Sequence, residues 1–192
     1  SAILDMSPAK IPFPASTDRP QVFAAIGEMC GRVAMLAGCA QPVLRPEINA
    51  AAIRLLNRLG IEVVVAKGAG CCGALTHHMG KTKSAHGFAR KNIAAWRREM
   101  SGKGLNAIVI TASGCGTTVK DYGFMFREDL SLRDDAEQVS AITCDITEYV
   151  ASLGEITAPQ SRKIKVAYHS ACSMQHGQKI TALPKELLKQ AG

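Results

Sequence analysis

Hydrophobic residues along this chain gather in short runs of the length of a β-strand. Four such runs lie at residues 32–39, 61–66, 106–112 and 164–169, and the first is apolar nearly throughout. Continuous apolar runs are typical of strands that are covered on both faces in a parallel sheet. The runs are far shorter than the roughly 20 residues that span a bilayer. We therefore predict four strands.

Segments with helical spacing separate these runs. Pro46 opens the first helix and Gly60 follows it, while a second helix is expected over residues 81–100. Shorter helices are expected at 117–126, 145–153 and 184–190. We expect residues 22–31 to form a short helix or part of an arm, and the charged connection 127–140 to be exposed. This alternation predicts an α/β fold, a parallel-sheet sandwich with helices on both faces.

Composition adds little beyond an ordinary globular protein. Of the 192 residues, 47% are hydrophobic and 20% charged, so the chain can bury a core. The net charge of +7 is scattered and only 5% of residues are aromatic, which argues against nucleic-acid binding. Residues 1–6 lack the basic region and apolar core of a signal peptide, so we expect a cytoplasmic protein.

Seven cysteines change the picture. An odd number without a secretion signal argues against a disulfide framework. Three predicted strands end at Cys39, at the adjacent pair Cys71 and Cys72, and at Cys115. Because the carboxyl ends of parallel strands share one edge of a sheet, we expect these four thiols to meet. The glycines beside them would let backbone approach a bulky group, which makes these candidate cofactor-binding residues: Gly70, Gly73 and Gly114.

Four converging thiolates suit an iron–sulfur cluster or zinc, because both favour soft sulfur ligands. The sequence contains no C-x₂-C pair, so it has neither a zinc ribbon nor a ferredoxin run. Adjacent cysteines turn inward on one small ion with difficulty, and a multi-iron cluster accepts them more easily. Three alternatives stay open at this point: an iron–sulfur cluster, zinc, and buried or redox-active thiols.

An internal repeat indicates the domain organisation. The sequence around Cys39 resembles the sequence around Cys172, and each is followed by a proline-initiated helix with paired leucines. We predict an arm over residues 1–31, one cysteine-rich domain over 32–160, and the start of a truncated second copy over 161–192. Cys172 would be a metal ligand of that second copy.

These motifs resemble a known family. Cys39, 31 further residues, Cys71-Cys72-Gly73, and Cys115 within Ser-Gly-Cys-Gly are similar to the cysteine-rich CCG domain. That domain occurs twice in the cysteine-rich subunit of heterodisulfide reductase and in iron–sulfur subunits of several dehydrogenases. The flanking residues resemble glycolate oxidase iron–sulfur subunits in particular; they are His77, Gly80, 89–93, Trp96, 112–116 and 176–179.

The resemblance implies electron transfer in a glycolate, or other 2-hydroxy-acid, oxidase complex. A flavin-containing partner subunit would oxidise the substrate, so no catalytic residue is expected in this chain. The arm would follow a ferredoxin domain that is missing here. A cluster of the 4Fe–4S type would be bound by Cys39, Cys71, Cys72 and Cys115, with zinc or no metal in this fragment as the alternatives.

The resemblance has limits that leave other partners open. Ala112 stands where heterodisulfide reductase has a further cysteine, so its two-cluster arrangement is not carried over. Related subunits serve lactate utilisation and anaerobic glycerol-3-phosphate dehydrogenase, which are alternative complexes. A zinc-binding or metal-free scaffold is a second kind of function, and a thiol–disulfide module a third. Through its complex, the chain would associate peripherally with the cytoplasmic face of the inner membrane.

Overall fold

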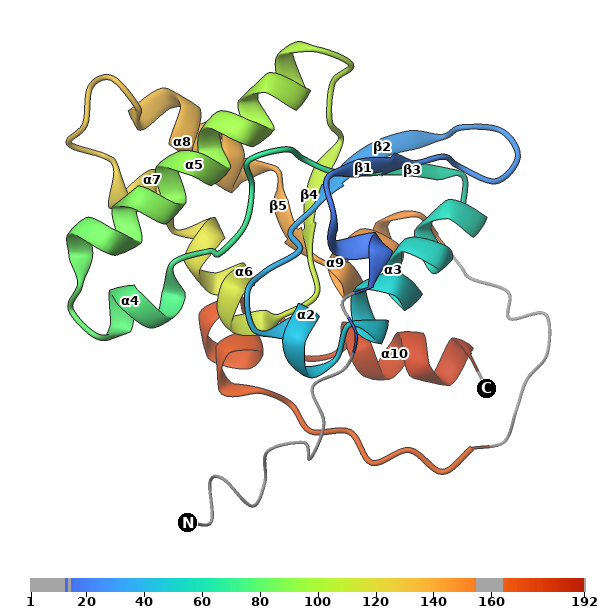
Figure 1. Cartoon of the computed structure of the whole chain (residues 1–192). Coiled ribbons are helices and arrows are strands. Elements are labelled where there is room, and N and C mark those ends of the chain that lie inside the picture. Colours follow the sequence, from blue (N-terminus) through green and yellow to red (C-terminus); the bar gives the residue numbers. More distant parts are fainter. Residues whose placement is uncertain (1–12, 14, 155–163, 192) are drawn as a thin grey trace.

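A mostly parallel β-sheet forms the centre of the protein (Figure 1). The computed structural model describes residues 13, 15–154 and 164–191 of the chain. The strands are β1 (Gln21–Phe23), β2 (Gly31–Met35), β3 (Ile61–Val65), β4 (Ala107–Ile110) and β5 (Thr143–Asp145), in the spatial order β1-β3-β2-β4-β5. Strands β3, β2, β4 and β5 run parallel, and β1 pairs antiparallel with β3 at one edge. A mixed α/β fold is therefore confirmed.

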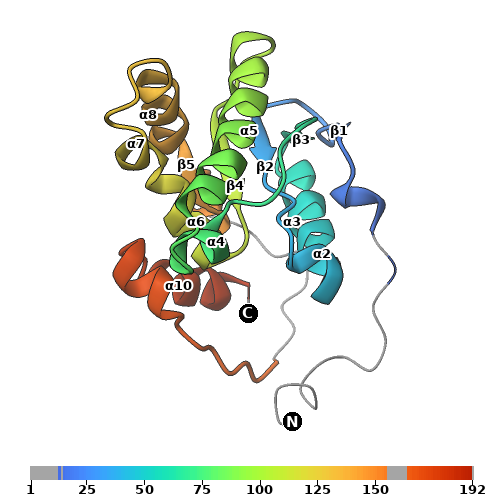
Figure 2. The same cartoon turned by 60° about the vertical axis from the view of Figure 1, so that its left-hand side comes forward.

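Helices cover both faces of the sheet (Figure 2). One face carries α5 (Thr82–Ser101), α6 (Ser113–Lys120), α7 (Tyr122–Met125) and α8 (Arg133–Ala141). The other carries α3 (Glu47–Arg58), α9 (Ile146–Ser152) and α10 (Leu183–Gln190). The short elements are η1 (Ser16–Asp18), α2 (Gln41–Leu44), α4 (Ala74–His78) and the π-helical turn η2 (Ser173–Gly177).

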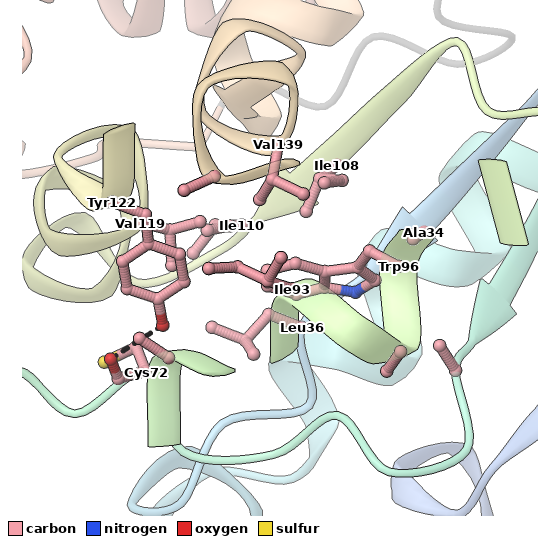
Figure 3. Close-up of a cluster of buried hydrophobic side chains, with 14 of the residues drawn as sticks. Ala34, Leu36, Cys72, Ile93, Trp96, Ile108, Ile110, Val119, Tyr122 and Val139 are labelled. Atoms are coloured by element: carbon pink, nitrogen blue, oxygen red, sulfur yellow. Dashed lines mark hydrogen bonds between the residues drawn. The ribbon is translucent and has the colours of Figure 1, made fainter. Parts of the chain in front are cut away.

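The alternation of side chains along β2 divides the core into two clusters. Val33 and Met35 pack toward α3, whereas Ala34 and the following Leu36 pack toward α5. Figure 3 shows the α5 cluster, in which the fully buried Trp96 lies against the sheet. Burial of this kind contributes about 25 cal/mol per Å² of apolar surface, so both clusters hold the strand ends in place.

The predicted strand at residues 164–169 is wrong. These residues have no regular structure, and Ile164 and Val166 are more than half exposed. The sheet edge beside β4 is instead occupied by β5, a three-residue strand that the sequence analysis missed. Apolar alternation alone does not make a strand when another segment already pairs with the available edge.

Three further predictions differ in detail. Residues 22–31 form neither a helix nor only an arm, because β1 pairs with β3 there. The connection 127–140 is not wholly exposed, since it contains most of α8, whose Ala136 and Val139 are buried. The helix expected at 117–126 begins at Ser113 and breaks at Asp121 into α6 and α7.

The domain boundaries and the internal repeat stay predictions. Within the described residues, η2 packs on α6 and α10 packs on α9. Residues 1–12 and 14 of the predicted arm lie outside the described residues, and the rest of it contains η1 and β1. In the part of the chain that the structure describes, no helix combines the length and apolar character needed to cross a membrane.

Candidate metal centre

Four cysteines line one cavity of about 250 Å³ at the carboxyl edge of the sheet. Cys39 follows β2, Cys71 and Cys72 follow β3, and Cys115 lies in the first turn of α6 after β4. The Cys71 sulfur lies 3.4 Å from that of Cys39, and the Cys72 sulfur lies 3.1 Å from that of Cys115. The structure thus brings together thiols that are 32 and 43 residues apart.

The remaining wall of this cavity, which we call the thiol cavity, is mostly apolar. Leu36, Ile110 and Ala74 contribute to it, and none of its described lining residues is charged. The thiols are therefore the strongest metal ligands in the wall. Soft thiolates select zinc, cuprous copper or iron–sulfur clusters over hard cations such as magnesium.

The thiols form two pairs instead of one compact group. In the described part of the chain, no three His, Cys, Asp or Glu side chains are placed to hold one metal ion. A single tetrahedral ion would need four ligands at about 2.3 Å from one point. The structure therefore presents four soft donors as two close pairs on one cavity wall.

Helix N-termini surround the thiol cavity. Cys39 is followed by α2, Cys72 is followed by α4, and Cys115 lies in the first turn of α6. The N-cap residues of these helices, Ala40, Gly73 and Ala112, make no capping hydrogen bond through a side chain. Their first N–H groups carry partial positive charge and lack intrahelical acceptors, so they favour a negatively charged occupant.

Backbone amides also reach the sulfurs directly. The Gly73 N–H donates to the Cys71 sulfur at 3.4 Å, and the Ala74 N–H donates to the Cys72 sulfur at 3.5 Å. Hydrogen bonds to ligand sulfurs are one of the means by which a protein sets the potential of an iron–sulfur cluster. Two such donors are thus present at the adjacent cysteines.

The thiols differ in their protonation. Burial raises the pKa of Cys39, and its hydrogen bond with Cys71 raises it further. The hydrogen bond between Cys72 and Cys115 raises the pKa of Cys72 and lowers the pKa of Cys115. Cys115 therefore becomes a thiolate before Cys72 does, with the Cys72 thiol as its donor.

The three candidate glycines have different environments. Gly114 lines the thiol cavity, and a Cβ there would meet no atom within 4 Å. Gly73 has φ of +87°, and a Cβ there would lie 3.0 Å from the Ala85 carbonyl oxygen of α5. Gly70 does not line the cavity, and its N–H donates to the Asn92 side chain at 2.8 Å. Gly73 is thus required by the turn and by helix packing, and cofactor binding by these glycines stays a prediction.

Cys172 stands apart from the other candidate ligands. It is exposed and does not line the thiol cavity. The neighbouring Ser173 hydroxyl lies 2.7 Å from the Ser113 hydroxyl at the start of α6, so Cys172 lies on a segment that packs beside the Cys115 helix. Its predicted role in a second domain stays a prediction.

Two buried asparagines near the site were missed from the sequence. The Asn92 amide of α5 donates to the Cys71 carbonyl at 2.9 Å, and the Asn49 amide of α3 donates to the Ala37 carbonyl at 3.1 Å. Each lies on a mostly apolar helix face, beside residues such as Ile93 or Ile53. A polar residue inside an apolar stripe was the available signal, because a buried amide needs a partner.

Comparisons with known proteins agree with the motifs. Residues 33–120 match the family model described as a cysteine-rich domain, CCG. The chain is 42% identical over 163 residues to the glycolate oxidase iron–sulfur subunit of Escherichia coli (strain K12), covering 84% of this chain and 39% of that protein. The resemblance inferred from the cysteine motifs is therefore confirmed.

Other relatives extend the range of complexes. A probable glycolate oxidase iron–sulfur subunit of Bacillus subtilis (strain 168) is 27% identical, over 89% of this chain and 38% of its own. Lactate utilization protein A of Exiguobacterium sp. is 27% identical, over 81% of this chain and 62% of its own. The chain therefore spans about two fifths of the two glycolate oxidase subunits. No solved structure matches it.

Proposed function

We propose that this chain, whose residues 33–120 match the cysteine-rich CCG domain family, is the cysteine-rich part of an electron-transferring iron–sulfur subunit in a complex that oxidises glycolate or a similar 2-hydroxy acid. The observation that carries the proposal is the meeting of four thiols in one uncharged cavity. Relatives named as glycolate oxidase iron–sulfur subunits support the choice of complex.

The residues of the thiol cavity fit a cluster of the 4Fe–4S type. Cys39, Cys71, Cys72 and Cys115 would be its ligands, because they are soft donors in a wall without charged side chains. A bound cluster would accept and release one electron at a time. Leu36 and Ile110 would exclude water from it, and the N–H groups at the start of α6 would offset its negative charge.

Substrate chemistry is assigned to a partner. We propose a flavin-containing subunit as the site of hydride removal, and no residue of this chain as a catalytic acid, base or nucleophile. We further propose that the complex works in the cytoplasm and associates peripherally with the inner membrane. A lactate-oxidising complex is the second candidate, since Lactate utilization protein A also matches most of this chain.

Anaerobic purification with iron and sulfide analysis tests the proposal. We expect roughly four iron atoms per chain and an electron paramagnetic resonance signal after reduction. Cys72→Ser and Cys115→Ser should each remove most of the iron. Cys30→Ser and Cys144→Ser should retain it, because neither thiol lines the cavity.

Two other results would contradict the proposal. Stoichiometric zinc without iron would support a zinc-binding scaffold. A metal-free chain whose adjacent cysteines cycle with an added disulfide would support a thiol–disulfide module. Reconstitution with ferrous iron and sulfide precedes either conclusion, so that cluster loss during handling is not mistaken for absence of binding.

A further inference from the structure

Two buried side chains hold both carbonyl groups of the adjacent cysteines. The Asn92 amide of α5 donates to the Cys71 carbonyl at 2.9 Å. The Tyr122 hydroxyl of α7 donates to the Cys72 carbonyl at 2.8 Å, as Figure 3 shows. Both side chains are almost fully buried, with 1% and 0% exposure. Neither Asn92 nor Tyr122 lines the thiol cavity.

The two side chains also contact each other. The Asn92 amide donates to the Tyr122 hydroxyl oxygen at 3.1 Å, while the Asn92 carbonyl oxygen accepts from the Gly70 N–H at 2.8 Å. Three consecutive residues of the loop, 70–72, are thus fixed by one buried pair from α5 and α7. Buried polar groups that are fully paired in this way favour a single conformation.

Because the peptide is planar, the direction of the Cys72 carbonyl also fixes the direction of the Gly73 N–H. In a trans peptide, the carbonyl of one residue and the N–H of the next point in opposite directions. Because the Cys72 carbonyl points toward Tyr122, the Gly73 N–H must point away from the core. It lies 3.4 Å from the Cys71 sulfur and donates to it. The Tyr122 hydroxyl therefore aims a hydrogen bond at a candidate metal ligand that it does not touch.

We propose that Tyr122, held by Asn92, is a positioning residue that raises the reduction potential of a cluster bound at Cys71 and Cys72. This inference rests on the proposed iron–sulfur function. An N–H donor stabilises a sulfur ligand more when the cluster gains an electron and its negative charge grows. Fixing the Gly73 amide toward the Cys71 sulfur therefore favours the reduced state.

Core packing accounts for the aromatic ring of Tyr122 but not for its hydroxyl group. The ring packs in the α5 cluster with Val119 and Ile110, as Figure 3 shows, and a phenyl ring would fill the same space. Burying a hydroxyl is unfavourable unless it is hydrogen-bonded. Here its two partners are Asn92 and the cysteine loop. Loss of the hydroxyl oxygen should thus change the conformation of the cysteine loop more than the packing of the core.

Tyr122→Phe tests this directly, with Tyr149→Phe as the matched control. Tyr149 lies in the other core cluster, against α3 and β2. After reconstitution with iron and sulfide, redox titration followed by electron paramagnetic resonance gives the midpoint potential. We expect Tyr122→Phe to shift the reduction equilibrium about tenfold toward the oxidised state, which is about 59 mV for one electron. Tyr149→Phe should leave the potential unchanged.

A second pair of variants separates positioning from stability. Asn92→Ala and Asn57→Ala each remove a buried amide that holds two backbone groups, since Asn57 donates to the Phe23 and Ile61 carbonyls. Both should lower the free energy of unfolding. Only Asn92→Ala should lower the midpoint potential. Equal potentials for Asn92→Ala, Tyr122→Phe and the wild type would overturn the proposal.

A readout without the cluster keeps the two proposals distinguishable. In the metal-free chain, Tyr122→Phe should speed amide hydrogen exchange at Gly73 several-fold, while Tyr149→Phe should not. Unchanged exchange at Gly73 would overturn the positioning role even if the wild-type chain takes up iron. Failure of the wild type to bind iron, with faster exchange in Tyr122→Phe, would overturn the iron–sulfur function and with it any effect on potential.

Discussion

Replacing Gly73 with alanine adds one methyl group between the adjacent cysteines and α5. Gly73 has φ of +87° and is the residue that precedes α4. The new Cβ would lie 3.0 Å from the Ala85 carbonyl oxygen and 3.3 Å from the Ala85 Cα. Both are backbone atoms of a twenty-residue helix, so they cannot move aside as a side-chain tip would.

The expected loss of stability follows from two contributions. A left-handed conformation costs an alanine about 1–2 kcal/mol relative to glycine. Overpacking against a fixed neighbour costs about 1–3 kcal/mol. The more restricted unfolded chain returns about 0.4–1 kcal/mol. Gly73→Ala should therefore lower the free energy of unfolding by about 1–5 kcal/mol, taking these ranges together.

Urea denaturation followed by circular dichroism measures this difference. With a slope of about 2 kcal/mol per molar urea, the midpoint should fall by about 0.5–2.5 M at unchanged slope. Gly114→Ala and Gly70→Ala are matched controls, because a Cβ at either position meets no atom within 4 Å. If Gly73→Ala unfolds at the wild-type midpoint, the tight approach of the cysteine loop to α5 is refuted.

Two further predictions concern residues outside the cysteine loop. Asn49→Ala removes the donor to the Ala37 carbonyl, two residues before Cys39. It should lower the free energy of unfolding by about 1–3 kcal/mol and speed alkylation of Cys39 by iodoacetamide. Equal alkylation rates in the variant and the wild type would contradict this. Burial raises the pKa of Cys144 to about 12. The stability from this neutral thiol is complete below its ordinary pKa of about 8.5 and is lost as pH rises toward 12, so Cys144→Ala should show a flatter decline in urea midpoint over that range than the wild type.

The central strands could be predicted because the apolar pattern of their sequences is typical of buried strands. Residues 61–66 are apolar apart from Glu62 and lie between a helix that ends at a glycine and a glycine turn, and β3 occupies nearly the same range. Strands β1 and β5 have three residues each, too few to show a period. At residues 164–169 a strand was predicted that the structure does not contain, because an apolar pattern does not reveal whether a sheet edge is available.

The candidate site could be predicted only in part, for a related reason. Parallel strands deliver their carboxyl ends to one edge, so the meeting of Cys39 and Cys115 follows from topology. The contacts of Asn92 and Tyr122 with the cysteine loop follow from side-chain packing between segments 21 to 50 residues apart. No local motif encodes such a contact, although an asparagine within the apolar stripe of α5 marks a position that needs a partner.

The wide separation of the four cysteines has a consequence for the order of assembly. A ferredoxin run of the form C-x₂-C-x₂-C carries three ligands of one cluster within about seven residues. Here the paired thiols are 32 and 43 residues apart and meet only once β2, β3 and β4 lie side by side. Closing such loops is entropically unfavourable until the sheet and its helices are packed. Cluster insertion would thus be the last step of maturation, after the chain has folded and the thiol cavity has formed.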